Sequence, residues 1–330
     1  MTLEINATTV RQWSRVGPRG MYGQAILDVA TRHEQVVVLS ADLGNSSGLD
    51  RFKNSFPDRF INVGVAEQNL IGVAAGVARE GFVPFASSFA PFISMRASEQ
   101  VRMNLGYMNL NVKAVGIGSG LAMGFLGNSH FGLEDVAVLR SIPGITIVSP
   151  ADCAEIVKTV RAAVDLEGPM YIRLTGSVNC PIVNTQEYDF EVGKAIALRG
   201  GSEVALIATG SMVAVSLAAA AELERRGLSA AVYNFHTIKP LDINTLQGIC
   251  EKYSNIVTVE EHARIGGLGS AVAETTAAWG NRPRHLIVGL PDAWGETGDY
   301  TYLLEHHELT TSHLTTKVER FLGANVNCLG

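Results

Sequence analysis

Glu67 is the residue whose position in this chain most favours chemistry. It lies in Asn62-Val-Gly-Val-Ala-Glu67, where a short strand becomes a helix of small residues that includes Gly72 and Gly76. Small residues lower helix propensity but let another backbone approach closely. A carboxylate in a first turn is favoured by the helix dipole, which is one explanation for it. The other is an acid held in an apolar interface, where it can share a proton with a cofactor nitrogen.

The elements around this acid alternate between short apolar runs and helical patterns. The runs that we expect to be strands are Val36-Val-Val-Leu39, Val83-Pro-Phe-Ala86, Val112-Lys-Ala-Val-Gly116, Ile145-Thr-Ile-Val148 and Tyr171-Ile-Arg-Leu174. Alternation of strands with helices is typical of a parallel sheet covered by helices. The pattern therefore predicts an α/β fold.

A polar, Pro-containing segment from about Ser177 to Glu191 separates this series from a second one. The second series has expected strands at 204–208, 230–235, 256–259 and 285–288, and a helix over 213–226 that ends before Gly227. We therefore expect two domains, 19–190 and 191–330, each a mainly parallel sheet flanked by helices. Residues 1–18 show no clear pattern, and we expect an N-terminal arm that packs on a partner.

The composition is that of an ordinary soluble protein, with 330 residues, 47% hydrophobic residues and a net charge of −6. No basic block supplies the charge that binds nucleic-acid phosphates, so nucleic acid is not an expected partner. No apolar run has membrane-spanning length, and the N-terminus lacks secretory features, so we expect a cytoplasmic protein. Cys153, Cys180, Cys250 and Cys328 lack metal-ligand spacing and are expected to be buried thiols.

Two glycine-rich turns fail to match nucleotide-binding fingerprints. Gly116-Ile-Gly118-Ser-Gly120-Leu121 has Leu where the third glycine of G-x-G-x-x-G belongs, and Gly266-Gly-Leu-Gly269 lies late in the chain with the wrong spacing. The sequence also has no G-x-x-x-x-G-K-S/T phosphate loop. We therefore expect no dinucleotide site.

Four stretches of the chain together resemble one enzyme family. They are the stretch around Glu67, Phe85-Ala-Ser-Ser-Phe89-Ala-Pro-Phe92, Asn128-Ser-His130-Phe-Gly-Leu-Glu134-Asp135, and Ile142-Pro143 through Ser149-Pro150-Ala-Asp152. In this combination the chain resembles, from about Arg19 onward, the C-terminal half of transketolases. It looks most like the smaller subunit of the split, two-component enzymes. It is more distantly similar to deoxyxylulose-phosphate synthase and to the beta subunit of 2-oxoacid dehydrogenases.

The resemblance implies thiamine diphosphate as the cofactor, with this chain gripping the aminopyrimidine ring. Glu67 is then the acid that hydrogen bonds to ring nitrogen N1′ and activates the cofactor by general acid-base catalysis. Phe89 and Phe92 match the aromatic residues around the ring, and Met95 stands where many members have a Tyr. Without the resemblance, both phenylalanines would be interpreted as core residues.

Two polar residues also match the family. His130 matches a histidine that faces the reacting carbonyl and helps to stabilise charge, which implies a catalytic and a substrate-binding role. Asp42, in Ser40-Ala-Asp-Leu43 after an apolar strand, matches an acid near the cofactor, and ligands of open α/β sheets gather at such carboxyl ends. A helix or turn cap explains Asp42 equally well.

The chain contains no Gly-Asp-Gly sequence, the motif that in this family binds the Mg²⁺ ion holding the diphosphate. The resemblance therefore implies no metal ligands in this chain and an N-terminal partner subunit that carries the motif. We expect an α2β2 complex with a large apolar interface, to which the small-residue helix after Glu67 is suited.

Arg19 and Ser46 match family positions that bind a sugar phosphate. Three other contacts of the family are missing. A phosphate-binding His of the family corresponds to Gly118 in this chain, an Asp that binds a substrate hydroxyl corresponds to Leu126, and an Arg corresponds to Gly176. Each lost charged hydrogen bond weakens binding by about 1.5–3 kcal/mol. We therefore expect two-carbon ketol transfer from a ketose (phosphate) to an atypical aldehyde that is less phosphorylated, larger or attached to a carrier.

Two other functions stay open from the sequence. A 2-oxoacid-decarboxylating enzyme of the same superfamily would share much of the site, although Arg19, Ser46 and the Asn-Ser-His130 context are closer to transketolase. A non-catalytic assembly subunit would explain the missing substrate contacts but not the retained Glu67 and His130.

Overall fold

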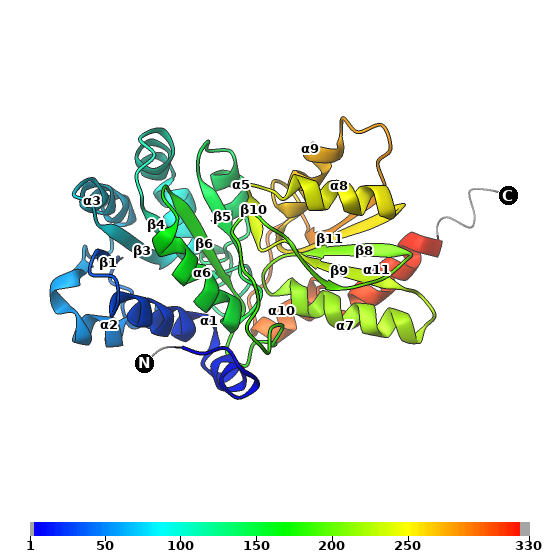
Figure 1. Cartoon of the computed structure of the whole chain (residues 1–330), viewed down its shortest axis with the longest axis horizontal. Helices are drawn as coiled ribbons and strands as arrows, with labels where there is room; N and C mark the ends of the chain where they lie inside the picture. The colour runs from blue at the N-terminus through cyan, green and yellow to red at the C-terminus, as the bar shows by residue number, and fades with distance from the viewer. Residues whose placement is uncertain (1–2, 324–330) are drawn as a thin grey trace.

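The computed structural model describes residues 3–323 and contains two helix-covered sheets that lie side by side (Figure 1). The first sheet has seven strands in the order β10-β5-β6-β4-β3-β1-β2. They are β1 (Val36–Ser40), β2 (Phe60–Asn62), β3 (Val83–Phe89), β4 (Lys113–Ser119), β5 (Thr146–Val148), β6 (Met170–Thr175) and β10 (Thr237–Lys239). Neighbouring strands are parallel except β10 with β5.

The second sheet has five strands in the order β12-β11-β8-β9-β7. They are β7 (Ile196–Arg199), β8 (Val204–Ala208), β9 (Ala230–Asn234), β11 (Asn255–Ala263) and β12 (Arg284–Leu290). Only β7 with β9 is antiparallel. The prediction of two mainly parallel sheets flanked by helices is confirmed.

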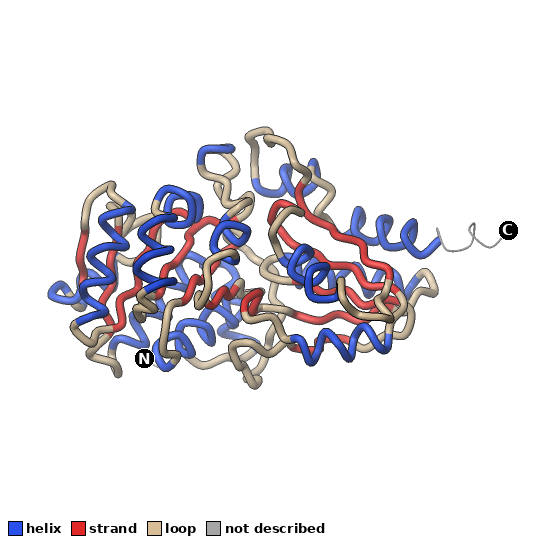
Figure 2. Tube along the Cα trace, turned by 90° about the horizontal axis from the view of Figure 1, so that it is seen from above, coloured by secondary structure: helices blue, strands red, loops and turns tan. Residues whose placement is uncertain are grey.

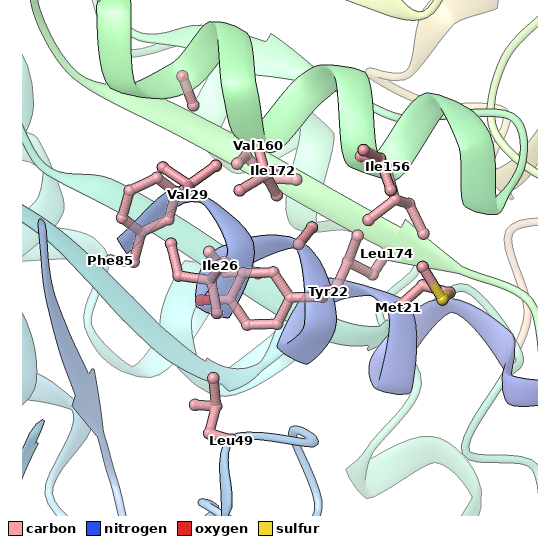
Figure 3. Packing of buried hydrophobic residues seen from close by; sticks show 14 of the residues in the cluster. Met21, Tyr22, Ile26, Val29, Leu49, Phe85, Ile156, Val160, Ile172 and Leu174 are labelled. Atoms are coloured by element: carbon pink, nitrogen blue, oxygen red, sulfur yellow. The ribbon is translucent and has the colours of Figure 1, made fainter. Parts of the chain in front are cut away.

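The first sheet is buried on both faces, which explains why its strands read as continuous apolar runs. Along β1, Val36 and Val38 pack with one group of helices, whereas Val37 and Leu39 pack with another. The helices of this half are α1 (Ala7–Ala30), α2 (Asp50–Ser55), α3 (Glu67–Arg79), α4 (Ser98–Gln100), α5 (Asp135–Arg140) and α6 (Cys153–Asp165), with π-helical segments at Phe92–Arg96 and Val101–Tyr107 and 3-10 turns at Pro57–Arg59 and Gly127–Ser129. Figure 3 shows side chains of α1 and α6 meeting beside β6.

The second sheet has the same layered arrangement, and Figure 2 shows helices around each sheet from above. Its helices are α7 (Met212–Arg225), α8 (Ile243–Lys252), α9 (Leu268–Thr276), α10 (Tyr300–His306) and α11 (Thr311–Gly323). The expected helix in this half is present as α7, and Gly227 follows it with a φ of 84°. Among residues 3–323, no helix is both long and apolar enough to cross a membrane.

Residues 7–16 are helical, although the sequence shows no clear pattern over residues 1–18. The side chain of Asn6 caps the first turn of α1, and the helix kinks at Gly17, where φ is 80°. Trp13 is buried, and its carbonyl accepts a hydrogen bond from the thiol of Cys153 at the start of α6. This segment therefore packs on its own chain, and a contact with a partner stays a prediction.

The cysteines in the described part of the chain are free thiols. Cys153 and Cys250 are buried and Cys180 is partly exposed, with the Sγ atoms of Cys153 and Cys180 3.3 Å apart. The prediction of buried thiols is thus confirmed for Cys153 and Cys250, while Cys328 lies outside the described residues.

The first sheet takes its edge strand from the second half of the chain. In β10, Thr237 lies opposite Val148 of β5. Lys239, the last residue of β10, donates hydrogen bonds from Nζ to the carbonyls of Arg140, at 2.9 Å, and Ile142. A boundary at residue 190 therefore divides the sequence but does not separate the first sheet from the second half.

Candidate active site

The predicted site residues gather at the carboxyl edge of the first sheet. Asp42 follows β1, Phe89 ends β3, and Glu67 begins the helix that follows β2. The carboxyl ends of parallel strands meet at one edge, which is where open α/β sheets bind their ligands. The topology therefore brings together residues that lie far apart in the sequence.

Glu67 is buried in the first turn of α3, with 2% of its surface exposed. Ser88 Oγ donates a hydrogen bond to Oε1 over 3.1 Å, and Arg96 Nη1 donates to Oε2 over 2.8 Å. The expected burial of this acid is found. Its ion pair with Arg96 was not predicted, and this pair offsets part of the cost of keeping a carboxylate away from water.

Arg96 reaches Glu67 from the π-helical turn Phe92–Arg96, a rare geometry that is frequent at functional sites. Its guanidinium carbon lies 4.0 Å from the centre of the Phe92 ring, and 47% of its side chain is exposed. A cation above an aromatic face is attracted by the ring quadrupole. Arg96 thus joins the buried carboxylate to the aromatic cluster and to the surface.

His130 packs against both predicted phenylalanines. Its ring centre lies 5.4 Å from that of Phe89 and 5.0 Å from that of Phe92, and the two phenylalanine rings are 6.0 Å apart. Ser129 Oγ lies 2.9 Å from His130 Nδ1. Burial and the charge of Arg96 lower the pKa of His130 below its ordinary value, so the imidazole is neutral at pH 7.

Arg96→Met is expected to raise the pKa of His130, because the substitution removes a repelling positive charge. Burial is the larger cause of the lowered pKa and remains, so the value should stay below the ordinary one. An NMR titration of the ¹³C-histidine-labelled chain measures this, with His130→Asn used for assignment. Arg102→Met, which removes an exposed arginine, is the control. An unchanged His130 pKa in Arg96→Met would contradict the electrostatic link.

Two predicted cofactor contacts lie at the rim of the site. Met95 is 48% exposed, and Asp42 is exposed with a φ of 61°, which is uncommon for a residue other than glycine. Asn62 Nδ2 donates to Asp42 Oδ1, and the Asp42 amide donates to Asn62 Oδ1, both over 3.0 Å. In the described chain this carboxylate caps no helix. A strained residue held in this way is a functional candidate.

A cleft of about 320 Å³ is lined by two of the predicted substrate residues, Arg19 and Ser46, but not by the third, His130. Its lining includes Arg19, Asn45, Ser46, Met123, Gly176 and Ser177. Arg19 Nη1 donates to the Ser46 carbonyl over 3.4 Å, so these two residues lie side by side. Within residues 3–323, Arg19 is the only charged residue that lines this cleft.

Comparison with known proteins finds a match for both halves of the chain. The transketolase pyrimidine binding domain matches residues 16–178, and the transketolase C-terminal domain matches residues 193–314. A putative transketolase C-terminal section from Methanocaldococcus jannaschii is 38% identical over 304 residues, which cover 92% of this chain and 95% of that protein. The chain belongs to the transketolase family.

Split transketolases resemble this chain over nearly its whole length. A 6-deoxy-6-sulfo-D-fructose transketolase subunit from a Clostridium species is 41% identical, with 90% of this chain and 91% of that subunit covered. A solved structure described as a split gene transketolase in an inactive beta4 tetramer has 39% identity and a TM-score of 0.84, covering 93% of this chain and 98% of that one. The predicted correspondence to the C-terminal subunit of split transketolases is confirmed.

Glycine stands at two positions where the resemblance to transketolases places substrate contacts. Gly118 has a φ of 64° and Gly176 a φ of 86°, values that residues with a side chain rarely adopt. A Cβ atom at Gly118 would also lie 2.7 Å from Met123 Cγ. A side chain at either position would therefore strain the backbone.

In this transketolase chain, helix α3 exposes a face of small residues. Leu70 and Ala74 are buried against the sheet side, whereas Gly72 and Gly76 are exposed. A Cβ atom at either glycine would meet nothing within 4 Å. Val65, just before the helix, is 75% exposed. Another backbone can therefore approach this face closely.

Proposed function

We propose that this chain is the C-terminal subunit of a thiamine diphosphate-dependent transketolase that moves a two-carbon ketol unit from a ketose (phosphate) to an aldehyde. The observation that carries the proposal is the buried Glu67 carboxylate joined to the Phe89, Phe92 and His130 cluster. A carboxylate beside aromatic rings fits an aminopyrimidine, whose faces stack and whose ring nitrogen shares a proton. When bound, thiamine diphosphate supplies a nucleophilic carbon that attacks carbonyl groups.

Each residue of the cluster has a separate task in this proposal. The Glu67 carboxylate shares a proton with the nitrogen of the pyrimidine ring, while Ser88 and Arg96 fix its orientation. Phe89 and Phe92 stack on the ring and exclude water. Ser129 engages Nδ1 of the neutral His130, so Nε2 is the nitrogen that binds the carbonyl oxygen of the substrate and stabilises charge there.

We also propose that the diphosphate and Mg²⁺ are held by an N-terminal partner subunit that carries a Gly-Asp-Gly motif. This chain has no such motif, and residues 3–323 contain no group of three or more His, Cys, Asp or Glu that could hold a metal ion. The exposed glycine face of α3 supports close contact with the partner. A similar split transketolase forms an inactive beta4 tetramer, which supports a requirement for the second subunit in an α2β2 enzyme.

The acceptor in this proposal differs from an ordinary sugar phosphate. Arg19 is the single charged residue that lines the cleft in the described chain, and Gly118 and Gly176 replace two charged family contacts. A phosphate dianion is usually bound by several charged donors, so one guanidinium favours a neutral or singly charged group. The relative named for 6-deoxy-6-sulfo-D-fructose supports an atypical substrate.

Reconstitution with the partner subunit tests this function. We expect ketol transfer from a ketose phosphate only in the mixture of both chains. We also expect a kcat/KM for ribose 5-phosphate that does not exceed that for unphosphorylated aldehydes, since each missing phosphate contact removes about 1.5–3 kcal/mol of binding free energy. Chromatography of the ketose product measures both, with each chain alone as the control. A clear preference for ribose 5-phosphate would remove the acceptor proposal.

The same reconstituted enzyme separates the alternatives. A 2-oxoacid-decarboxylating enzyme releases carbon dioxide from pyruvate or a related acid, whereas ketol transfer releases none. A non-catalytic subunit would leave turnover nearly unchanged when Glu67 is replaced.

A further inference from the structure

Backbone hydrogen bonds join the two ends of the loop that carries His130. The Gly120 amide donates to the Gly132 carbonyl over 2.9 Å, and the Gly132 amide donates to the Gly120 carbonyl over 3.1 Å. Between these two glycines the only regular structure is the 3-10 turn Gly127–Ser129. We call residues 120–132 the His130 loop. Its own backbone offers little rigidity, so its position must depend on contacts from outside.

The second half of the chain holds the base of this loop. Glu261, at 1% exposure in β11, accepts a hydrogen bond at Oε1 from the Leu121 amide over 2.7 Å. Its Oε2 accepts from the hydroxyls of Tyr300, over 2.6 Å, and Ser211. A Cβ atom at Gly120 would lie 2.2 Å from Glu261 Oε1. The Glu261 carboxylate therefore occupies space that a side chain at position 120 would need.

A second contact from the same half holds the tip of the loop. Asn128 Nδ2 donates to the Gly295 carbonyl over 2.7 Å, and the Gly295 amide donates to Asn128 Oδ1 over 3.0 Å. The Gly298 amide donates to the Gly124 carbonyl over 3.1 Å. A Cβ atom at Gly124 would lie 2.3 Å from the Gly298 carbonyl oxygen. Residues 295–298 thus lie directly along the tip of the loop. Asn128, which they contact there, is two positions before His130.

We propose that residues 295–298 and Glu261 position His130, and that Asn128 is the positioning residue at the tip. His130 owes its place against Phe89 and Phe92 to a loop whose base and tip are both bonded to the C-terminal half. The C-terminal domain then contributes to the reaction without touching the substrate. The catalytic part of this inference rests on the proposed function, whereas the positioning part does not.

The first test uses the chain alone and needs no activity. Asn128→Ala removes both side-chain hydrogen bonds at the tip, and since the residue is exposed the variant is expected to fold. Hydrogen exchange of peptides from 121–131 should become about tenfold faster, as expected for the loss of one to two net hydrogen bonds. The NMR cross-peak of the His130 ring should shift. Asn54→Ala, at an exposed position of α2, is the matched control and should change neither.

A second variant disrupts the same contact by a steric clash instead of by removing hydrogen bonds. Gly124→Ala places a methyl group against the Gly298 carbonyl and the Leu303 side chain, so it should separate the loop from residues 295–298 and reproduce the effects of Asn128→Ala. Unchanged exchange and an unchanged His130 cross-peak in both variants would overturn the positioning of the loop.

The reconstituted enzyme supplies the catalytic readout. Asn128→Ala should lower kcat about tenfold while the KM for the ketose donor changes less than about twofold, because a displaced His130 weakens charge stabilisation more than binding. A loosened loop with unchanged kcat would overturn the link to catalysis. If the wild-type complex transfers no ketol unit, the proposed function fails, while the exchange and NMR results still decide the positioning.

Discussion

Glu67→Gln is expected to lower kcat of the reconstituted enzyme by about 100- to 10,000-fold, the range typical for removing a general acid or base. Glutamine keeps the size of the side chain and can still accept a hydrogen bond from Ser88. It carries no charge, so it can neither take up a proton nor pair with Arg96. The measurement is steady-state ketol transfer with saturating thiamine diphosphate and Mg²⁺.

The matched control for this prediction is Glu80→Gln. Glu80 is exposed at the other end of the same helix, so its replacement should leave kcat within about twofold. Circular dichroism and the size of the complex establish that both variants fold and assemble. Turnover that survives Glu67→Gln nearly intact would favour a purely architectural subunit over a catalytic one.

Arg173→Met is expected to lower the free energy of unfolding of the isolated chain by about 3–5 kcal/mol, the usual cost of breaking a buried ion pair. The Arg173 side chain is 2% exposed, and its Nε donates to Asp135 Oδ2 over 2.9 Å. Its Nη2 donates to the carbonyls of Gly132, over 2.8 Å, and Glu261, over 2.9 Å. Methionine fills similar space but leaves the Asp135 charge unpaired. Urea denaturation followed by circular dichroism measures the loss.

Two further variants test the physical cause of this loss. Arg225→Met removes an arginine whose side chain is 75% exposed and paired with Glu222, so we expect a change below about 1 kcal/mol. Adding Asp135→Asn to Arg173→Met should recover part of the lost stability, because no unpaired charge then remains buried. A loss as small as that of Arg225→Met would show that the buried pair contributes little.

The strands were the most predictable part of this molecule. Val204–Ala208 was expected as a strand and is β8 with the same bounds, because a strand buried on both faces reads as an unbroken apolar run. Glu67 and the aromatic residues were also singled out from the sequence, since a small-residue helix and the family motifs mark them, and their roles stay predictions. Their mutual distances required the fold.

Other features depended on contacts that a sequence pattern does not contain. The helix at residues 7–16 carries Arg11, Gln12 and Arg15 on its exposed side, which conceals a short apolar stripe. Arg96 pairs with Glu67 across 29 positions and through a π-helical turn, a geometry without a reliable sequence signal. The sequence offers one indication of this pair, because Arg96 follows Phe92 by four residues, about one helical turn. The short edge strand β10 is defined by its pairing with β5.

The edge strand β10, which the second half of the chain contributes to the first sheet, also has a consequence during synthesis of the protein. As the nascent polypeptide leaves the ribosome, β5 has an open edge until Thr237–Lys239 emerges, by which time β7, β8 and β9 are already outside. An open edge is a site where strands of other chains can pair. Translation therefore delivers the final strand of the first sheet only when most of the second is present, and the two halves mature together.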